Sequence, residues 1–97
     1  MELKKVGVSG TLESSDVMIT LEPGSGGIEI ELSSSVEKQF GEAIRREIFS
    51  TLESMGVKSA RITAVDKGAL DCVIRARVKT AVCRAADVDY VWGGDSQ

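Results

Sequence analysis

The feature that most constrains the fold is a helical apolar pattern in the middle of the chain. Apolar side chains recur there every three or four residues, at Val36, Phe40, Ile44, Ile48, Leu52 and Met55. Ser34 and Glu37 have the spacing of a capping box at the start of the helix, and Gly56 stands where a C-terminal cap is expected. A helix of about 20 residues is roughly 30 Å long. It can therefore cover one face of a small sheet.

Three other segments have the two-residue period of half-buried strands. Val17 to Pro23 and Ile28 to Ser33 are joined by "GSGG", which predicts a hairpin with one acidic face. Arg61 to Val65 also alternates and leads into the turn signal "DKG". The sequence therefore predicts two strands before the helix and at least one after it.

The segment from Cys72 to Ala86 fits two patterns. As a strand up to about Lys79, it places Val73, Arg75, Arg77 and Lys79 on one uninterrupted face. As a helix, it aligns a different set, namely Leu70, Ile74, Val78, Ala81 and Ala85. The uninterrupted alternate face favours the strand, and the helix stays open as the alternative.

These elements predict one domain over residues 1–97, because a chain of about 100 residues supports a single core. The fold class is α+β: a two-layer sandwich in which one long helix covers a small antiparallel or mixed sheet, with the element order ββαββ. Residues 1–9 and 88–97 are expected to be flexible ends.

Composition excludes several classes of partner. The net charge of −3 and the small number of aromatic residues disfavour a nucleic-acid ligand. No apolar run approaches the roughly 20 residues that a membrane-spanning helix needs, so no membrane partner is expected. The first residues, "MELKKVGVSG", lack the apolar stretch of a signal peptide, which predicts a cytoplasmic protein.

The residues available for catalysis are few. The chain has no histidine, so triads and imidazole metal sites are excluded. Cys72 and Cys83 lack the spacing of a zinc site or a redox pair and are expected to be reduced, buried or half-buried thiols. The carboxylates of Asp66 and Asp71 flank a loop without further oxygen ligands, so it is interpreted as a turn. We assign no catalytic residue and no metal ligand.

Two adjacent serines, Ser14 and Ser15, lie between Glu13 and Asp16 just before the first predicted strand. Pattern alone favours a surface turn in which the polar side chains bind nearby backbone. Neither serine has a basic partner in the sequence that would make it a nucleophile. The alternative is that one hydroxyl is a substrate, to which a separate enzyme attaches a group on an exposed turn.

A basic line, Arg75, Arg77 and Lys79 with Arg84 nearby, also allows two interpretations. The favoured one is a solvated strand face that pairs with Glu29 and Glu31 across the sheet. The other is a contact surface for a partner or an anionic group. It leads to an alternative function for the chain, a non-enzymatic regulatory α+β module that binds a small ligand or a partner.

Three motifs resemble those of a known family: "GTLESSDVMI", "SSVEKQFG" and "DKGALDCVIRARV". From about Val6 to about Ala86, the chain resembles the acyl carrier protein, or gamma chain, of citrate lyase. More distantly, it is similar to the carrier subunit of malonate decarboxylase. The resemblance implies a carrier that breaks no bond itself, because the chemistry resides in its prosthetic group and in the partner subunits.

The resemblance also implies a site. Ser14 matches the serine that is joined through a phosphodiester to phosphoribosyl-dephospho-coenzyme A by a dedicated transferase, with Ser15 the less favoured position. An acetate-thiol ligase would then acetylate the thiol of this arm. The alpha chain would exchange acetyl for citryl, and the beta chain would cleave the citryl thioester to oxaloacetate.

Overall fold

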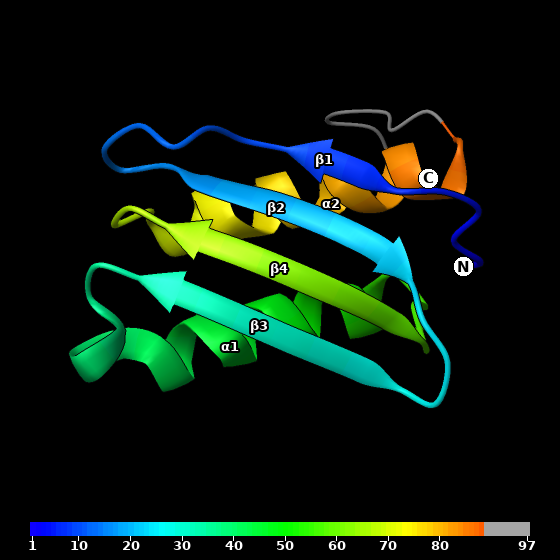
Figure 1. The fold of residues 1–97 in the computed structure, drawn as a ribbon, viewed down its shortest axis with the longest axis horizontal. Helices are drawn as coiled ribbons and strands as arrows, with labels where there is room; N and C mark the ends of the chain where they lie inside the picture. Colours follow the sequence, from blue (N-terminus) through cyan, green and yellow to red (C-terminus); the bar gives the residue numbers. More distant parts are fainter. Residues whose placement is uncertain (89–97) are drawn as a thin grey trace.

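The computed structural model describes residues 1–88, which form a four-stranded sheet with two helices on one of its faces (Figure 1). The elements, in chain order, are β1 (Gly7–Ser9), β2 (Val17–Pro23), β3 (Ile28–Ser34), α1 (Glu37–Ser54), β4 (Ala60–Asp66) and α2 (Asp71–Ala86). The predicted α+β two-layer sandwich is confirmed, with two helices in the second layer in place of one. No helix within the described residues is long and apolar enough to cross a membrane.

The order of the strands in the sheet is β1-β2-β4-β3. β4 is antiparallel to β2 and parallel to β3, so it lies between the two strands that were predicted to form a hairpin. The hairpin prediction is therefore wrong. Residues 24–27 instead connect the end of β2 to the start of β3 across the first residue of β4, Ala60, whose amide donates to the Gly27 carbonyl. An alternating pattern fixes which face of a strand is buried, but not which strand lies beside it.

The central helix α1 is confirmed, and it ends as predicted. Gly56 has a φ of 75°, its amide donates to Glu53, and the Val57 amide donates to Leu52, which is the Schellman arrangement. The predicted capping box does not form. The helix begins at Glu37 without a side-chain cap, and the Ser34 hydroxyl binds Asp66 at the end of β4 instead.

The segment after β4 is a helix, so the strand favoured for residues 72–79 is wrong. The alternative helical pattern describes α2 better, because four of its five residues, Ile74, Val78, Ala81 and Ala85, are buried. The fifth, Leu70, lies just before the helix and is exposed. The fourth strand of the sheet is β1, which pairs with β2 from the part of the chain expected to be a flexible end. Of the other expected flexible end, 88–97, all but Val88 lies outside the described residues.

The first strand depends on a glycine. A Cβ placed on Gly7 would lie 2.2 Å from the Ala81 carbonyl oxygen of α2, so only glycine lets the backbones of β1 and α2 approach this closely. Just before β1, the amides of Lys4 and Lys5 both donate to the carbonyl of Ala85 near the end of α2. These contacts fix the N-terminal strand on the edge of the sheet.

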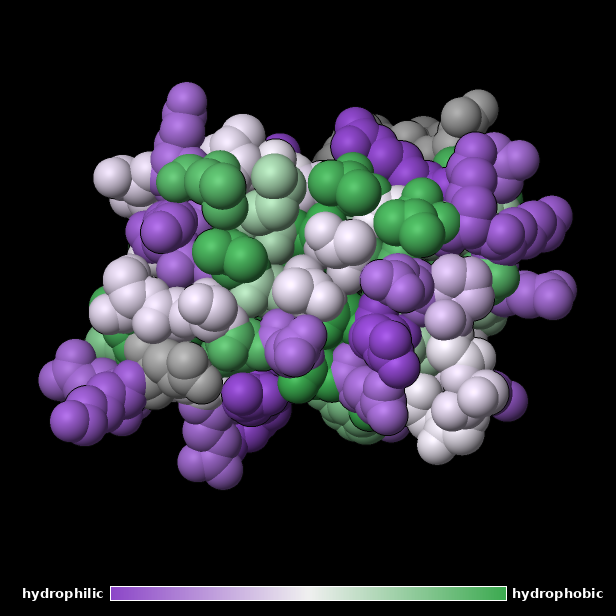
Figure 2. All heavy atoms as spheres, viewed as in Figure 1, coloured by the Kyte–Doolittle hydropathy of each residue, from purple (hydrophilic) through white to green (hydrophobic). Residues whose placement is uncertain are grey.

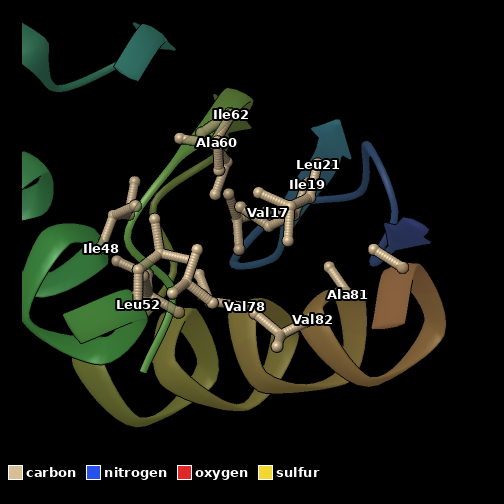
Figure 3. Packing of buried hydrophobic residues seen from close by; sticks show 14 of the residues in the cluster. Val17, Ile19, Leu21, Ile48, Leu52, Ala60, Ile62, Val78, Ala81 and Val82 are labelled. Carbon is tan, nitrogen blue, oxygen red and sulfur yellow. The ribbon is translucent and has the colours of Figure 1, made fainter. Parts of the chain in front are cut away.

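The core lies between the sheet and the two helices (Figure 3). Alternate residues of β2 and β4 point into it, and Ile48, Leu52, Val78 and Val82 meet them from the helices. The other face of the sheet is uncovered, and Figure 2 shows hydrophobic and hydrophilic residues mixed on it. Of the two cysteines, Cys83 is buried, as expected, whereas Cys72 is exposed at the start of α2; neither forms a disulfide.

Candidate functional site

The two serines occupy a tight turn between β1 and β2. The Asp16 amide donates to the Glu13 carbonyl at 3.2 Å, which closes a four-residue turn with Ser14 and Ser15 at its centre. Ser15 has a φ of 65°, while Ser14 has a negative φ, the combination found in type II turns, which favour glycine at the third position. Both serines are exposed. The predicted surface turn is therefore confirmed, but of its serine and aspartate side chains only Asp16 binds nearby backbone, through the Val17 amide.

The turn is held against the loop that joins β4 to α2. The Ser15 amide donates to the Lys67 carbonyl at 2.8 Å, and the Lys67 amide donates back to the Asp16 carbonyl at 2.9 Å. The backbone of Ser15 is thus committed to the neighbouring loop. The Ser14 hydroxyl has no hydrogen bond to any part of the described chain, so it is available to a partner.

Asp16 is the most highly coordinated side chain near the turn. Its two carboxylate oxygens accept hydrogen bonds from two nitrogens of the Arg77 guanidinium, one from Nε at 3.0 Å and one from Nη2 at 2.8 Å. The Thr11 hydroxyl and the Val17 amide donate to the same carboxylate, each at 2.7 Å. A paired, two-bond contact of this kind fixes the orientation of both side chains. The Asp16 side chain is only 13% exposed and that of Arg77 39% exposed.

These contacts change the acidity of the carboxylate. The hydrogen bonds from Arg77, with smaller contributions from Thr11 and Val17, lower the pKa of Asp16 from 3.8 to about 2 against the opposing effect of burial. The same pair raises the pKa of Arg77. Asp16 is therefore ionised throughout the physiological range, and its charge is balanced by Arg77.

This shift predicts a contribution to stability that depends on pH. Because the pKa of Asp16 is lower in the folded than in the unfolded chain, the contribution is complete above about pH 5 and is lost as pH falls from about 4 towards 2. We expect Asp16→Asn to be less stable than the wild type by about 2 kcal/mol at pH 6, and the gap to shrink by about 1 kcal/mol at pH 3. Urea unfolding of both proteins at these pH values measures it. A gap that stays constant with pH would contradict the assignment, because every other carboxylate is common to both proteins.

The basic line predicted from the sequence does not exist as a line. Residues along a helix are turned by about 100° each, so Arg75 and Arg77 point in different directions. Arg75 binds Glu47 of α1 at 3.0 Å, whereas Arg77 binds Asp16 beside the serine turn. The predicted pairing of this line with Glu29 and Glu31 is also wrong. Glu29 binds Arg61 of the adjacent strand, at 3.3 Å.

The loop after β4 is the turn that the sequence predicted. Asp66 is 1% exposed and accepts hydrogen bonds from the Ser34 hydroxyl and from the amides of Gly68 and Ala69. The carboxylate therefore shapes the loop on which the serine turn rests. Within residues 1–88, no cluster of three or more cysteine or acidic residues could hold a metal ion.

Sequence reasoning found the turn and its serines but missed three residues that hold them. Thr11 and Arg77 bind Asp16 through their side chains, and Lys67 binds the turn through its backbone. Arg77 lies 61 positions from Asp16 in the sequence. Nothing in the spacing or composition of either segment signals that contact.

Comparison with known proteins defines the class of this chain. Residues 4–85 match a family model described as "Malonate decarboxylase delta subunit". The fold is similar to a chain in the crystal structure of a Pseudomonas malonate decarboxylase hetero-tetramer in complex with malonate. The TM-score is 0.56 at 21% identity, over 88% of this chain and 92% of that one. The chain therefore belongs to the family that this model describes, and the structural match shows the same fold.

Curated relatives narrow the assignment. A citrate lyase acyl carrier protein of Streptococcus equi subsp. zooepidemicus (strain H70) is 61% identical over 94 residues, 95% of this chain and 92% of the relative. One from Vibrio cholerae serotype O1 (strain M66-2) is 53% identical over 92 residues, 94% of each chain. The chain therefore belongs to the family of the citrate lyase acyl carrier proteins. These relatives are named as carriers, not as catalytic subunits.

Proposed function

We propose that this chain is the acyl carrier subunit of a citrate lyase and that Ser14 carries its prosthetic group through a phosphodiester. The observation that supports the site is the turn itself. It presents two exposed hydroxyls, those of Ser14 and Ser15, neither of which has a hydrogen bond within the described chain, on a backbone held by the neighbouring loop. A separate enzyme that supplies its own base can reach such a group.

The residues around Ser14 fit a covalently attached phosphate. Repulsion from Asp16 is reduced because Arg77 neutralises its charge at 2.8 Å, and Glu13 is exposed to screening by solvent. During attachment, the Ser14 oxygen would form a bond to phosphorus, its proton would pass to the attaching enzyme, and the P–O bond to the donor's leaving group would break. Ser15 is the less favoured site, because the family resemblance matches Ser14 to the modified serine.

The proposed group is phosphoribosyl-dephospho-coenzyme A, which supplies a terminal thiol that holds an acyl group as a thioester. The role of this chain is to position the arm, and tethering raises the local concentration of the thioester at each partner to about the millimolar scale. The proposed partners are the alpha and beta chains of the lyase, the prosthetic-group transferase and the acetate-thiol ligase, all in the cytoplasm. The alternative of a ligand-binding module rested on the basic line, which the fold disperses.

Mass spectrometry of the protein co-produced with its attaching enzymes tests this proposal. We expect intact wild type and Ser15→Ala to gain the mass of the arm, and Ser14→Ala to gain none, because that variant lacks the oxygen that forms the ester. Peptide mapping should place the added mass on Ser14. An unmodified wild-type chain would count against the carrier role, provided that the same enzymes load an authentic citrate lyase acyl carrier protein in a parallel sample.

A further inference from the structure

We propose that Arg77 is a positioning residue for the loading of Ser14: by holding both carboxylate oxygens of Asp16, it fixes the turn that presents the serine hydroxyl to the attaching enzyme. This inference rests on the proposed function and adds to it a residue on α2, a helix that is distant in the sequence but in contact with the turn. It assigns Arg77 no contact with the reacting atoms.

The Asp16 carboxylate is bonded both to its own loop and to α2. Two of its donors, Thr11 and Val17, come from the same loop and from the first residue of β2, so they bind the carboxylate to segments that are close to the turn in the sequence. The two bonds from Arg77 come from α2, whose inner face is buried in the core. Arg77 is therefore the side chain that joins the carboxylate at the end of the serine turn to a rigid element.

Asp16 also shapes the turn through its backbone. Its amide closes the turn on Glu13, and its carbonyl accepts from Lys67. Ser15 is a non-glycine residue held at a positive φ, a conformation that persists only where surrounding contacts impose it. When Arg77 releases Asp16, one of those contacts is lost, and we expect the turn to sample other conformations.

The positive charge of Arg77 also favours loading, because it balances the negative charge of Asp16. Without the guanidinium, the Asp16 carboxylate would face the phosphate that is being attached two residues away. Arg77→Lys separates the two effects, because lysine keeps the charge but cannot donate from two fixed nitrogens to two oxygens. Arg77→Gln removes both.

The chain offers a matched control on the same helix. Arg75 also forms an ion pair, but with Glu47 of α1, away from the serine turn. Arg75→Gln therefore removes the same charge from α2 and breaks a contact of similar length. A general effect of net charge or helix docking should appear in both variants, whereas an effect on the turn should appear only at Arg77.

The experiment measures loading of wild type, Arg77→Gln, Arg77→Lys and Arg75→Gln by the purified attaching enzyme, with folding checked by circular dichroism. We expect kcat/KM to fall about tenfold for Arg77→Gln, mainly through a higher KM for the carrier, because fewer molecules hold the competent turn. Arg77→Lys should lose about threefold, and Arg75→Gln should stay within about twofold of wild type. Rates for Arg77→Lys equal to wild type and for Arg77→Gln equal to Arg75→Gln would overturn the proposal.

A measurement without the enzyme tests the turn directly. The Ser15 amide donates to Lys67, so its hydrogen exchange reports opening of the turn. We expect faster exchange at Ser15 in Arg77→Gln and no change in Arg75→Gln. Unchanged exchange in Arg77→Gln overturns the positioning role. A wild type that is never loaded overturns the proposed function as well, so the two failures are distinguishable.

A double-mutant cycle separates positioning from direct recognition by the enzyme. If Arg77 acts only through Asp16, then Asp16→Asn with Arg77→Gln should load no more slowly than the slower of the two single variants. If the two losses multiply, Arg77 acts independently of Asp16, and the proposed role is wrong. If Arg77→Gln does not fold, the same cycle with Arg77→Lys gives the answer.

Discussion

Gly10→Ala is expected to destabilise the domain by about 3 kcal/mol or more. Gly10 has a φ of 96°, and a Cβ at this position would lie 1.8 Å from the carbonyl oxygen of Val17, the first residue of β2. Positive φ alone costs an L-residue roughly 1 kcal/mol or more, and displacing backbone in a packed region adds about 1–3 kcal/mol. Since small domains are stable by only about 5–15 kcal/mol, urea unfolding will resolve this loss.

Gly26→Ala is the matched control. Its φ of 84° imposes the same kind of backbone penalty, but a Cβ there meets no atom within 4 Å. We expect Gly26→Ala to lose only about 1 kcal/mol. The difference in stability between the two variants measures the cost of crowding between Gly10 and the Val17 carbonyl. This contact joins the residue after β1 to the first residue of β2. Equal losses would show that this approach is not tight.

The elements that could be predicted from the sequence are those whose periodicity has a single solution. β2 alternates without fault and α1 repeats every three or four residues, so each pattern matches one kind of element. Gly56 could be placed at the helix end for the same reason, since a left-handed residue there favours glycine. These features depend on neighbours in the sequence.

The main errors in the fold concern contacts between distant segments. β4 separates β2 from β3, yet the burial of alternate residues would be the same if β2 and β3 were adjacent. α2 carries both an alternating and a helical pattern, and nothing in the segment itself decides between them. The fourth strand of the sheet is instead β1, a three-residue strand too short to have a period of its own.

The site divides in the same way. The turn around Ser14 is a local feature, and the sequence predicts it from the cluster of serines and acids. The choice of Ser14 as the attachment point came from the family resemblance, not from this pattern. The contact between Asp16 and Arg77 depends on how α2 packs against the sheet, which required the fold.

Ile48→Ala is expected to destabilise the domain by about 3 kcal/mol. Ile48 is fully buried on the face of α1 that meets the core, and removing its side chain leaves a cavity that the packed surroundings fill only in part. Alanine is the stronger helix former, which offsets a few tenths of a kcal/mol. Urea unfolding gives the difference, and the far-ultraviolet circular dichroism of the folded variant should match that of the wild type.

Phe40→Ala tests how far the helical pattern of α1 describes burial. The pattern assigns Phe40 to the same face as Ile48, but Phe40 is 53% exposed. It lies in the first turn of α1, which extends beyond the end of the sheet in Figure 1, so the core does not reach it. We therefore expect Phe40→Ala to change stability by no more than about 0.5 kcal/mol. A loss as large as that of Ile48→Ala would mean that something covers the start of the helix. A small change would show that an apolar period predicts the direction in which a helix faces its sheet, whereas the length of the sheet decides how many turns are buried.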